Sequence, residues 1–180
     1  MDYIEVFQAM LDDMRSDLRH YLRGNQKDYL YRAQTDAADA NAVNRLRLCW
    51  ALAYSDKPVQ EQAQIVRTLF DAECTALERS GNPGGSTALT LLTAMLKEYE
   101  PADGPLFERL KKAAPGCDPA ACRIRPAEEM TLEDCMETAA ATGMGSYLFT
   151  LTVCASRMYD AETVQRLREQ YRVQGKHTGV

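Results

Sequence analysis

The chain has 180 residues, of which 46% are hydrophobic and 26% are charged, proportions that are ordinary for a globular protein. Its 21 basic and 26 acidic residues give a net charge of −5, which disfavours a generic nucleic-acid binder because such proteins gain affinity by neutralising phosphates. The length predicts one domain, or two very small ones, and the composition excludes disordered, collagen-like and membrane-spanning chains.

Hydrophobic residues recur at helical spacing along nearly the whole chain. The first predicted helix carries an apolar stripe and ends at Gly24-Asn25, two residues that accept the left-handed conformation of a helix end. Its stripe consists of Tyr3, Phe7, Met10, Met14, Leu18 and Tyr21. A helical turn or two is expected at residues 28–34, and further helices are expected at about residues 36–54, 58–79, 86–99, 104–114, 131–142, 146–159 and 160–173.

Two segments have compositions that are not typical of a helix. Residues 115–126 contain three of the seven prolines and are predicted to form a loop. The apolar run at residues 147–153 has the composition of a strand, but no second strand is predicted to pair with it. We therefore expect this run to form a buried helix.

The predicted fold is all-α, a single compact domain over residues 1–173 with seven or eight helices packed as helical hairpins, followed by a flexible tail at 174–180. The hairpins can form either a bundle or a solenoid-like array. Tyr54, Tyr99 and Tyr159 each close an apolar helix, but their spacings of 45 and 60 residues are unequal. Repeat families keep a nearly constant period, so the bundle is favoured.

The six cysteines are too few for a disulfide-rich scaffold, and the acidic start does not resemble a secretory signal. We expect a cytoplasmic protein with reduced thiols. Cys49, Cys74 and Cys154 fall on apolar helix faces and are assigned to the core.

Cys117 and Cys122 lie in the predicted loop and are weak candidates for a metal site or a reversible disulfide. Structural zinc needs four ligands, and the two histidines, His20 and His177, lie near opposite ends of the chain. Neither a metal nor a cofactor is expected.

The charge is most uneven where five acidic residues fall within ten positions that contain no basic residue: Glu128, Glu129, Glu133, Asp134 and Glu137. Glu129, Glu133 and Glu137 are spaced by four, which predicts one helical face. Acidic residues are stabilised at a helix start, and this alone accounts for part of the cluster. The functional interpretation is an acidic surface that binds a basic partner.

The sequence thus favours a non-catalytic protein-interaction module, either an adaptor or a small acidic inhibitor, for instance of a nucleic-acid enzyme. It would bind a protein partner with a basic surface, and neither a membrane nor direct nucleic-acid binding is expected. One alternative is a thiol- or metal-dependent enzyme that uses the Cys117–Cys122 loop. Another is a DNA-binding regulator that uses Arg166, Arg168 and Arg172 of the last helix.

Overall fold

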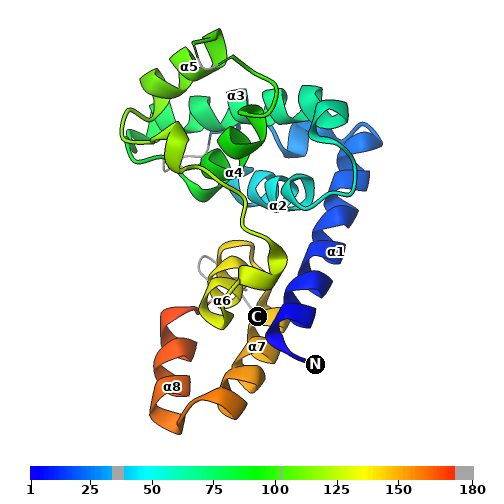
Figure 1. The fold of residues 1–180 in the computed structure, drawn as a ribbon, viewed down its shortest axis with the longest axis vertical. Helices are drawn as coiled ribbons and strands as arrows, with labels where there is room; N and C mark the ends of the chain where they lie inside the picture. Colours follow the sequence, from blue (N-terminus) through cyan, green and yellow to red (C-terminus); the bar gives the residue numbers. More distant parts are fainter. Residues whose placement is uncertain (34–38, 102, 173–180) are drawn as a thin grey trace. The chain divides into compact units, whose positions relative to one another are not determined.

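The computed structural model describes residues 1–33, 39–101 and 103–172, and within them the fold is all-α, as predicted. The eight α-helices of this part (Figure 1) are α1 (Tyr3–Leu22), α2 (Ala42–Ala53), α3 (Ala63–Ser80), α4 (Thr87–Leu96), α5 (Pro105–Ala113), α6 (Leu132–Ala141), α7 (Gly145–Met158) and α8 (Ala161–Gln170). Its short 3₁₀ turns are η1 (Gln26–Asp28), η2 (Val59–Gln62), η3 (Pro119–Ala121) and η4 (Ala127–Glu129). The described residues form no strand, only an isolated bridge between Ala33 and Asp39.

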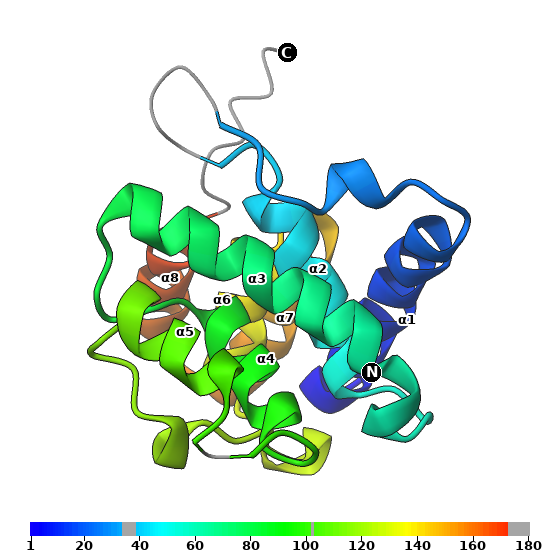
Figure 2. The same ribbon diagram turned by 90° about the horizontal axis from the view of Figure 1, so that it is seen from above.

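The chain divides into two compact units, each with its own helix pairs. Unit 1 comprises Met1–Asp13 and Arg125–Val180, and unit 2 comprises Met14–Ile124, so α1 contributes residues to both. In unit 2, α4 packs against α2 and α3, and α3 also packs against α5 (Figure 2). In unit 1, α7 packs against α6 and α8. Helices adjacent in sequence therefore pair, as predicted. A single domain over 1–173 stays a prediction, and the expected tail at 174–180 lies outside the described residues.

Capping residues determine several helix ends, at positions that the sequence predicts. The side chain of Ser86 accepts a hydrogen bond from the backbone N–H of Leu89 at 3.1 Å and so begins α4. Asp160 begins α8 in the same way by accepting from the N–H of Thr163 at 2.7 Å. Gly81 ends α3 with a φ of 69°, a left-handed conformation that glycine adopts without strain.

The start of α2 differs from the expectation, because the helix begins at Ala42 and not near residue 36. Residues 34–38 lie outside the described part, and residues 39–41 are not helical. The amide of Asn41 donates to the carbonyls of Lys27 and Leu30, each at 2.9 Å, while Asp39 accepts from the backbone N–H of Asn41 at 3.0 Å. These hydrogen bonds hold the segment against residues 27–30 and compete with a helical turn.

The apolar run at 147–153 is helical, as predicted, but it is not fully buried. Leu148 and Leu151 of α7 face the interior of unit 1, whereas Phe149 is 71% exposed and Val153 is also exposed. The polar residues of this run, Thr150 and Thr152, are two positions apart, a spacing that does not mark one face of a helix, so its outward side could not be recognised. The expectation of a buried helix is therefore correct for only one side of α7.

An ion network is buried at the centre of unit 2. The guanidinium of Arg45, on α2, is 0% exposed and pairs with Asp39 and with Glu73 of α3, at 2.6 Å for Nε to Glu73 Oε2. Burial disfavours the charged form of Arg45, but the two carboxylates outweigh this effect and raise its pKa. Arg45 Nη1 also donates to the carbonyl of Tyr29 at 3.4 Å, so this buried charge has partners on several sides.

The same network fixes the start of α4. Ser86 Oγ donates to Glu73 Oε1 at 2.8 Å while it caps α4, so one hydroxyl joins the ion network to a helix end. Eight of the ten residues of α4 are buried in unit 2.

None of the described helices combines the length and the apolar character that crossing a membrane requires.

We predict that Arg45→Met destabilises the protein by about 3–5 kcal/mol, because it leaves Asp39 and Glu73 buried without their cation. The free energy of unfolding from urea denaturation measures the loss. The matched control is Lys111→Met, which removes an exposed pair with Glu108 (3.3 Å) and should cost at most about 1 kcal/mol. Equal losses in the two variants would contradict a structural role for the buried network.

Candidate partner-binding surface

The predicted acidic cluster lies around the start of α6 in unit 1. Thr131 begins the helix through a capping box: its Oγ1 accepts from the N–H of Asp134 at 3.1 Å, and Asp134 Oδ2 accepts from the N–H of Thr131 at 3.0 Å. The sequence pattern of Thr131 and Asp134 predicts this start. One member of the cluster is therefore already engaged by the helix itself.

Asp134 has a second local partner, which separates it further from the rest of the cluster. Its Oδ2 lies 2.8 Å from the guanidinium of Arg125, a pair that is about two-thirds to three-quarters buried. Burial tends to raise the pKa of Asp134, but the hydrogen bonds from Thr131 and the charge of Arg125 outweigh burial and lower it. Asp134 thus stabilises α6, and this role makes it a poor candidate for contact with a partner.

The other four acidic residues are exposed: Glu128, Glu129, Glu133 and Glu137. Within the described part of the chain, no ion pair to their carboxylates is found. Only Glu133 and Glu137 share a face of α6, one turn apart, because the helix begins at Leu132. The expectation that Glu129 continues this face is wrong. Glu129 lies in η4, and Met130 and Thr131 follow in extended conformations that break the helical register.

The other side of α6 is anchored in the interior of unit 1. Leu132, Cys135, Met136 and Ala139 are all buried, and α6 packs against α7. Glu133 and Glu137 therefore project from a helix whose position is fixed by apolar burial. A fixed helix presents its carboxylates at a constant separation, which lowers the entropy lost when a partner binds.

The acidic residues act on a nearby side chain that the sequence does not single out. Burial raises the pKa of Tyr171, just after α8, and the negative charges of Glu133, Glu137 and Asp134 raise it further, against the opposing charge of Arg166. Tyr171 thus lies within the electrostatic field of the cluster. It is more than thirty residues from Glu133 and Glu137 in the chain, and no local motif relates them.

The loop cysteines lie together in unit 2. Cys117 Sγ and Cys122 Sγ are 3.8 Å apart, and both thiols are free. Among the described residues, no group of three or more histidine, cysteine, aspartate or glutamate side chains is arranged to hold a metal ion. The pair by itself supplies only two of the four ligands of a zinc site.

Three of the remaining thiols, those of Cys49, Cys74 and Cys135, are in poor environments for nucleophilic chemistry. Burial raises the pKa of Cys74 and of Cys135 to about 12, and raises that of Cys49 well above its ordinary value. A thiol with a raised pKa is seldom in the reactive thiolate form. His20 is exposed and lies 3.3 Å from Asp28, while His177 lies outside the described residues.

The basic residues proposed for DNA contact lie on or just after α8. Arg166 and Arg168 are exposed on this helix and Arg172 follows it. The helix also carries Glu162 and Glu169, so the charges over Ala161–Gln170 cancel. Hence α8 presents a mixed surface and not a basic stripe, and a basic stripe is what phosphate binding requires.

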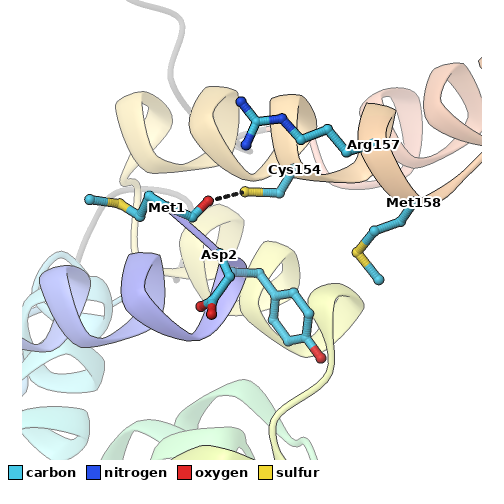
Figure 3. Close-up of a pocket in the computed structure, with 6 residues that line it drawn as sticks. Met1, Asp2, Cys154, Arg157 and Met158 are labelled. Atoms are coloured by element: carbon cyan, nitrogen blue, oxygen red, sulfur yellow. Dashed lines mark hydrogen bonds between the residues drawn. The ribbon is translucent and has the colours of Figure 1, made fainter.

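Unit 1 also has a surface pocket of about 340 Å³ beside the first residues of α1. Its lining consists of Met1, Asp2, Tyr3, Cys154, Arg157 and Met158. Figure 3 shows Cys154 facing Met1, whose carbonyl accepts a hydrogen bond from the thiol at 3.6 Å. Asp2 Oδ1 accepts from the N–H of Glu5 at 2.9 Å, so its carboxylate caps α1. The pocket is mostly apolar, and the charged side chains in its lining are those of Asp2, which is engaged as a helix cap, and Arg157.

Comparisons with protein-family models, with curated proteins and with solved structures found no match to this chain. Its functional assignment therefore depends on the chemistry of its own surface.

We predict that Asp134→Asn destabilises the protein by about 1–2 kcal/mol at pH 7, because it weakens the capping box and removes the charge opposite Arg125. Asp134 has a lowered pKa in the folded state, so its stabilisation is complete above its unfolded pKa, near 3.8, and is lost as the pH falls through the folded pKa. Urea denaturation at pH 7 and at low pH should therefore show that the free energies of unfolding of wild type and Asp134→Asn become equal in acid.

Glu128→Gln, which removes an exposed carboxylate nearby, is the control. A gap between wild type and Asp134→Asn that is independent of pH would contradict this account.

Proposed function

We propose that the protein is a non-catalytic interaction module that binds a basic surface of a protein partner through Glu128, Glu129, Glu133 and Glu137, which we call the acidic surface. The observation that carries this proposal is the pair Glu133 and Glu137. Both carboxylates are exposed on a helix that is anchored by its buried side. Asp134, by contrast, contributes to the negative field but is held by Thr131 and Arg125.

The chemistry of the partner follows from the charge of this surface. Exposed carboxylates attract lysine and arginine side chains and accelerate the encounter of two proteins. They repel phosphates, so the proposal does not include direct nucleic-acid binding. A basic protein surface that itself binds nucleic acid fits well, and this favours an inhibitor of a nucleic-acid enzyme or an adaptor for one.

The raised pKa values of Cys49, Cys74 and Cys135 support a binding role over thiol catalysis. The proposal also keeps the cytoplasmic location that the sequence favours. Binding through exposed carboxylates is weakened by salt, because counter-ions screen charges that are separated by more than about 8–10 Å at physiological ionic strength. Partner affinity should therefore fall as salt is added.

We predict that the double variant Glu133→Lys/Glu137→Lys weakens partner capture at least about tenfold, since like charges then oppose each other across the interface. The immobilised protein is used to capture partners from a lysate of its native host. Each captured protein is purified and titrated with wild type and variant at two salt concentrations. Circular dichroism checks that the variant stays folded, which is expected because both side chains are exposed.

The matched control is Glu61→Lys/Glu98→Lys, which makes the same change in net charge at two exposed positions of unit 2. This control should retain the affinity of wild type. If the control loses as much affinity as the α6 variant, the effect belongs to net charge. If neither variant loses affinity, the acidic surface is not the binding site.

A further inference from the structure

The loop that carries Cys117 and Cys122 is attached to both ends of α4. The backbone N–H of Gly116 donates to the carbonyl of Pro83 at 2.8 Å, in the segment that leads into α4. The ammonium group of Lys97, at the end of α4, donates to the carbonyls of Pro119 and Cys122 at 2.8 and 2.7 Å. The loop is therefore held in place by contacts that do not involve the sulfur atoms.

Within this loop the two sulfur atoms are in van der Waals contact, with 3.8 Å between Cys117 Sγ and Cys122 Sγ. Cys122 is only 3% exposed and its thiol donates to the carbonyl of Asp118 at 3.4 Å, whereas Cys117 is partly exposed. The pair thus combines a partly exposed cysteine with a buried one. A disulfide requires the two sulfurs to approach from this contact distance to about 2.0 Å.

We propose that Cys117 and Cys122 are a reversible dithiol–disulfide site that exchanges with low-molecular-weight disulfides such as glutathione disulfide. This proposal concerns unit 2 and is independent of the acidic surface. Cys117 Sγ, as a thiolate that has given its proton to water, attacks one sulfur of the disulfide, forming a mixed disulfide and releasing the first glutathione as a thiolate, which takes up a proton from water. Cys122 Sγ then attacks Cys117 Sγ, and its proton goes to the second glutathione sulfur as that leaves. Two protein thiols are oxidised and one disulfide is reduced to two thiols.

The environments of the two sulfurs assign this order of attack. Burial and the neighbouring Cys117 raise the pKa of Cys122 to about 11, so Cys122 remains a thiol until the mixed disulfide has formed. Cys117 is the more exposed residue of the two and is the one that a dissolved disulfide can approach first. Exchange rates depend on both access and thiolate content, and Cys122, which is buried and has a raised pKa, has little of either.

Closing the loop has a consequence for the stability of unit 2. A crosslink restricts the unfolded chain and so favours the folded state. The loop bonds to the segments at both ends of α4, and Ser86 at the start of α4 bonds to Glu73 of the buried ion network. Oxidation therefore stabilises a part of the protein that is already held together by hydrogen bonds and ion pairs.

The proposal is tested on the reduced full-length protein, incubated with mixtures of reduced and oxidised glutathione and then alkylated and digested with trypsin. Cys117 and Cys122 fall in one tryptic peptide, residues 113–123, because no lysine or arginine separates them. We expect this peptide to escape alkylation and to be about 2 Da lighter than its reduced form, the mass of two hydrogens. Added dithiothreitol should restore two alkylation sites, and oxidation should raise the melting temperature.

Two variants separate this site from other thiols. Cys154 contributes to the raised pKa of Cys135, so these two cysteines are the pair in unit 1 that could form a disulfide instead. The variant Cys135→Ala/Cys154→Ala should therefore leave oxidation of the 113–123 peptide unchanged. In Cys117→Ser the melting temperature should no longer respond to oxidised glutathione. The proposal is overturned if the wild-type peptide stays fully alkylated or gains only glutathione adducts. Zinc that wild type retains and Cys117→Ser loses would also contradict it. The peptide assay uses the unaltered chain and does not depend on the folding of a variant.

Discussion

A buried arginine sets the conditions under which unit 2 can fold. Arg45 has no exposed surface, and a charge without water is stable only where carboxylates and carbonyls surround it. Asp39 and Glu73 provide the carboxylates, and each must therefore reach the same point inside the unit. Through the hydroxyl of Ser86, this requirement extends to the start of α4. The non-helical segment before α2, the packing of α3 and the cap of α4 are thus coupled by one cation.

In unit 1 most side chains of the acidic cluster are exposed, whereas the ion network of unit 2 is buried, and the functional proposal depends on this exposure. Its acidic residues stand outside the apolar interior, around the start of α6, where the helix dipole favours negative charge. Asp134 is held by Thr131 and Arg125, while Glu133 and Glu137 remain exposed. The helix end offsets part of the repulsion between these carboxylates. The surface is therefore stable in the absence of a partner, as the proposed function requires.

The features that depend on near neighbours could be predicted from the sequence, and those that depend on distant residues could not. The caps at Ser86 and Asp160 require residues only three positions away, and the helical spacing of apolar residues establishes the all-α class. The burial of Arg45 could not be predicted from the sequence, because its partner Glu73 is 28 residues away. In the candidate site, the exposure of Glu133 and Glu137 follows from their pattern. The separation of Glu129 depends on the extended backbone of Met130 and could not be read from the spacing.

Hydrogen–deuterium exchange on the chain alone and in complex with a purified captured partner shows whether the acidic surface on η4 and α6 contacts the partner. We expect amides within residues 128–141 to exchange more slowly in the complex, while those of α3 and α5 in unit 2 keep their rates. Protection confined to unit 2, with unchanged exchange at 128–141, would contradict the account.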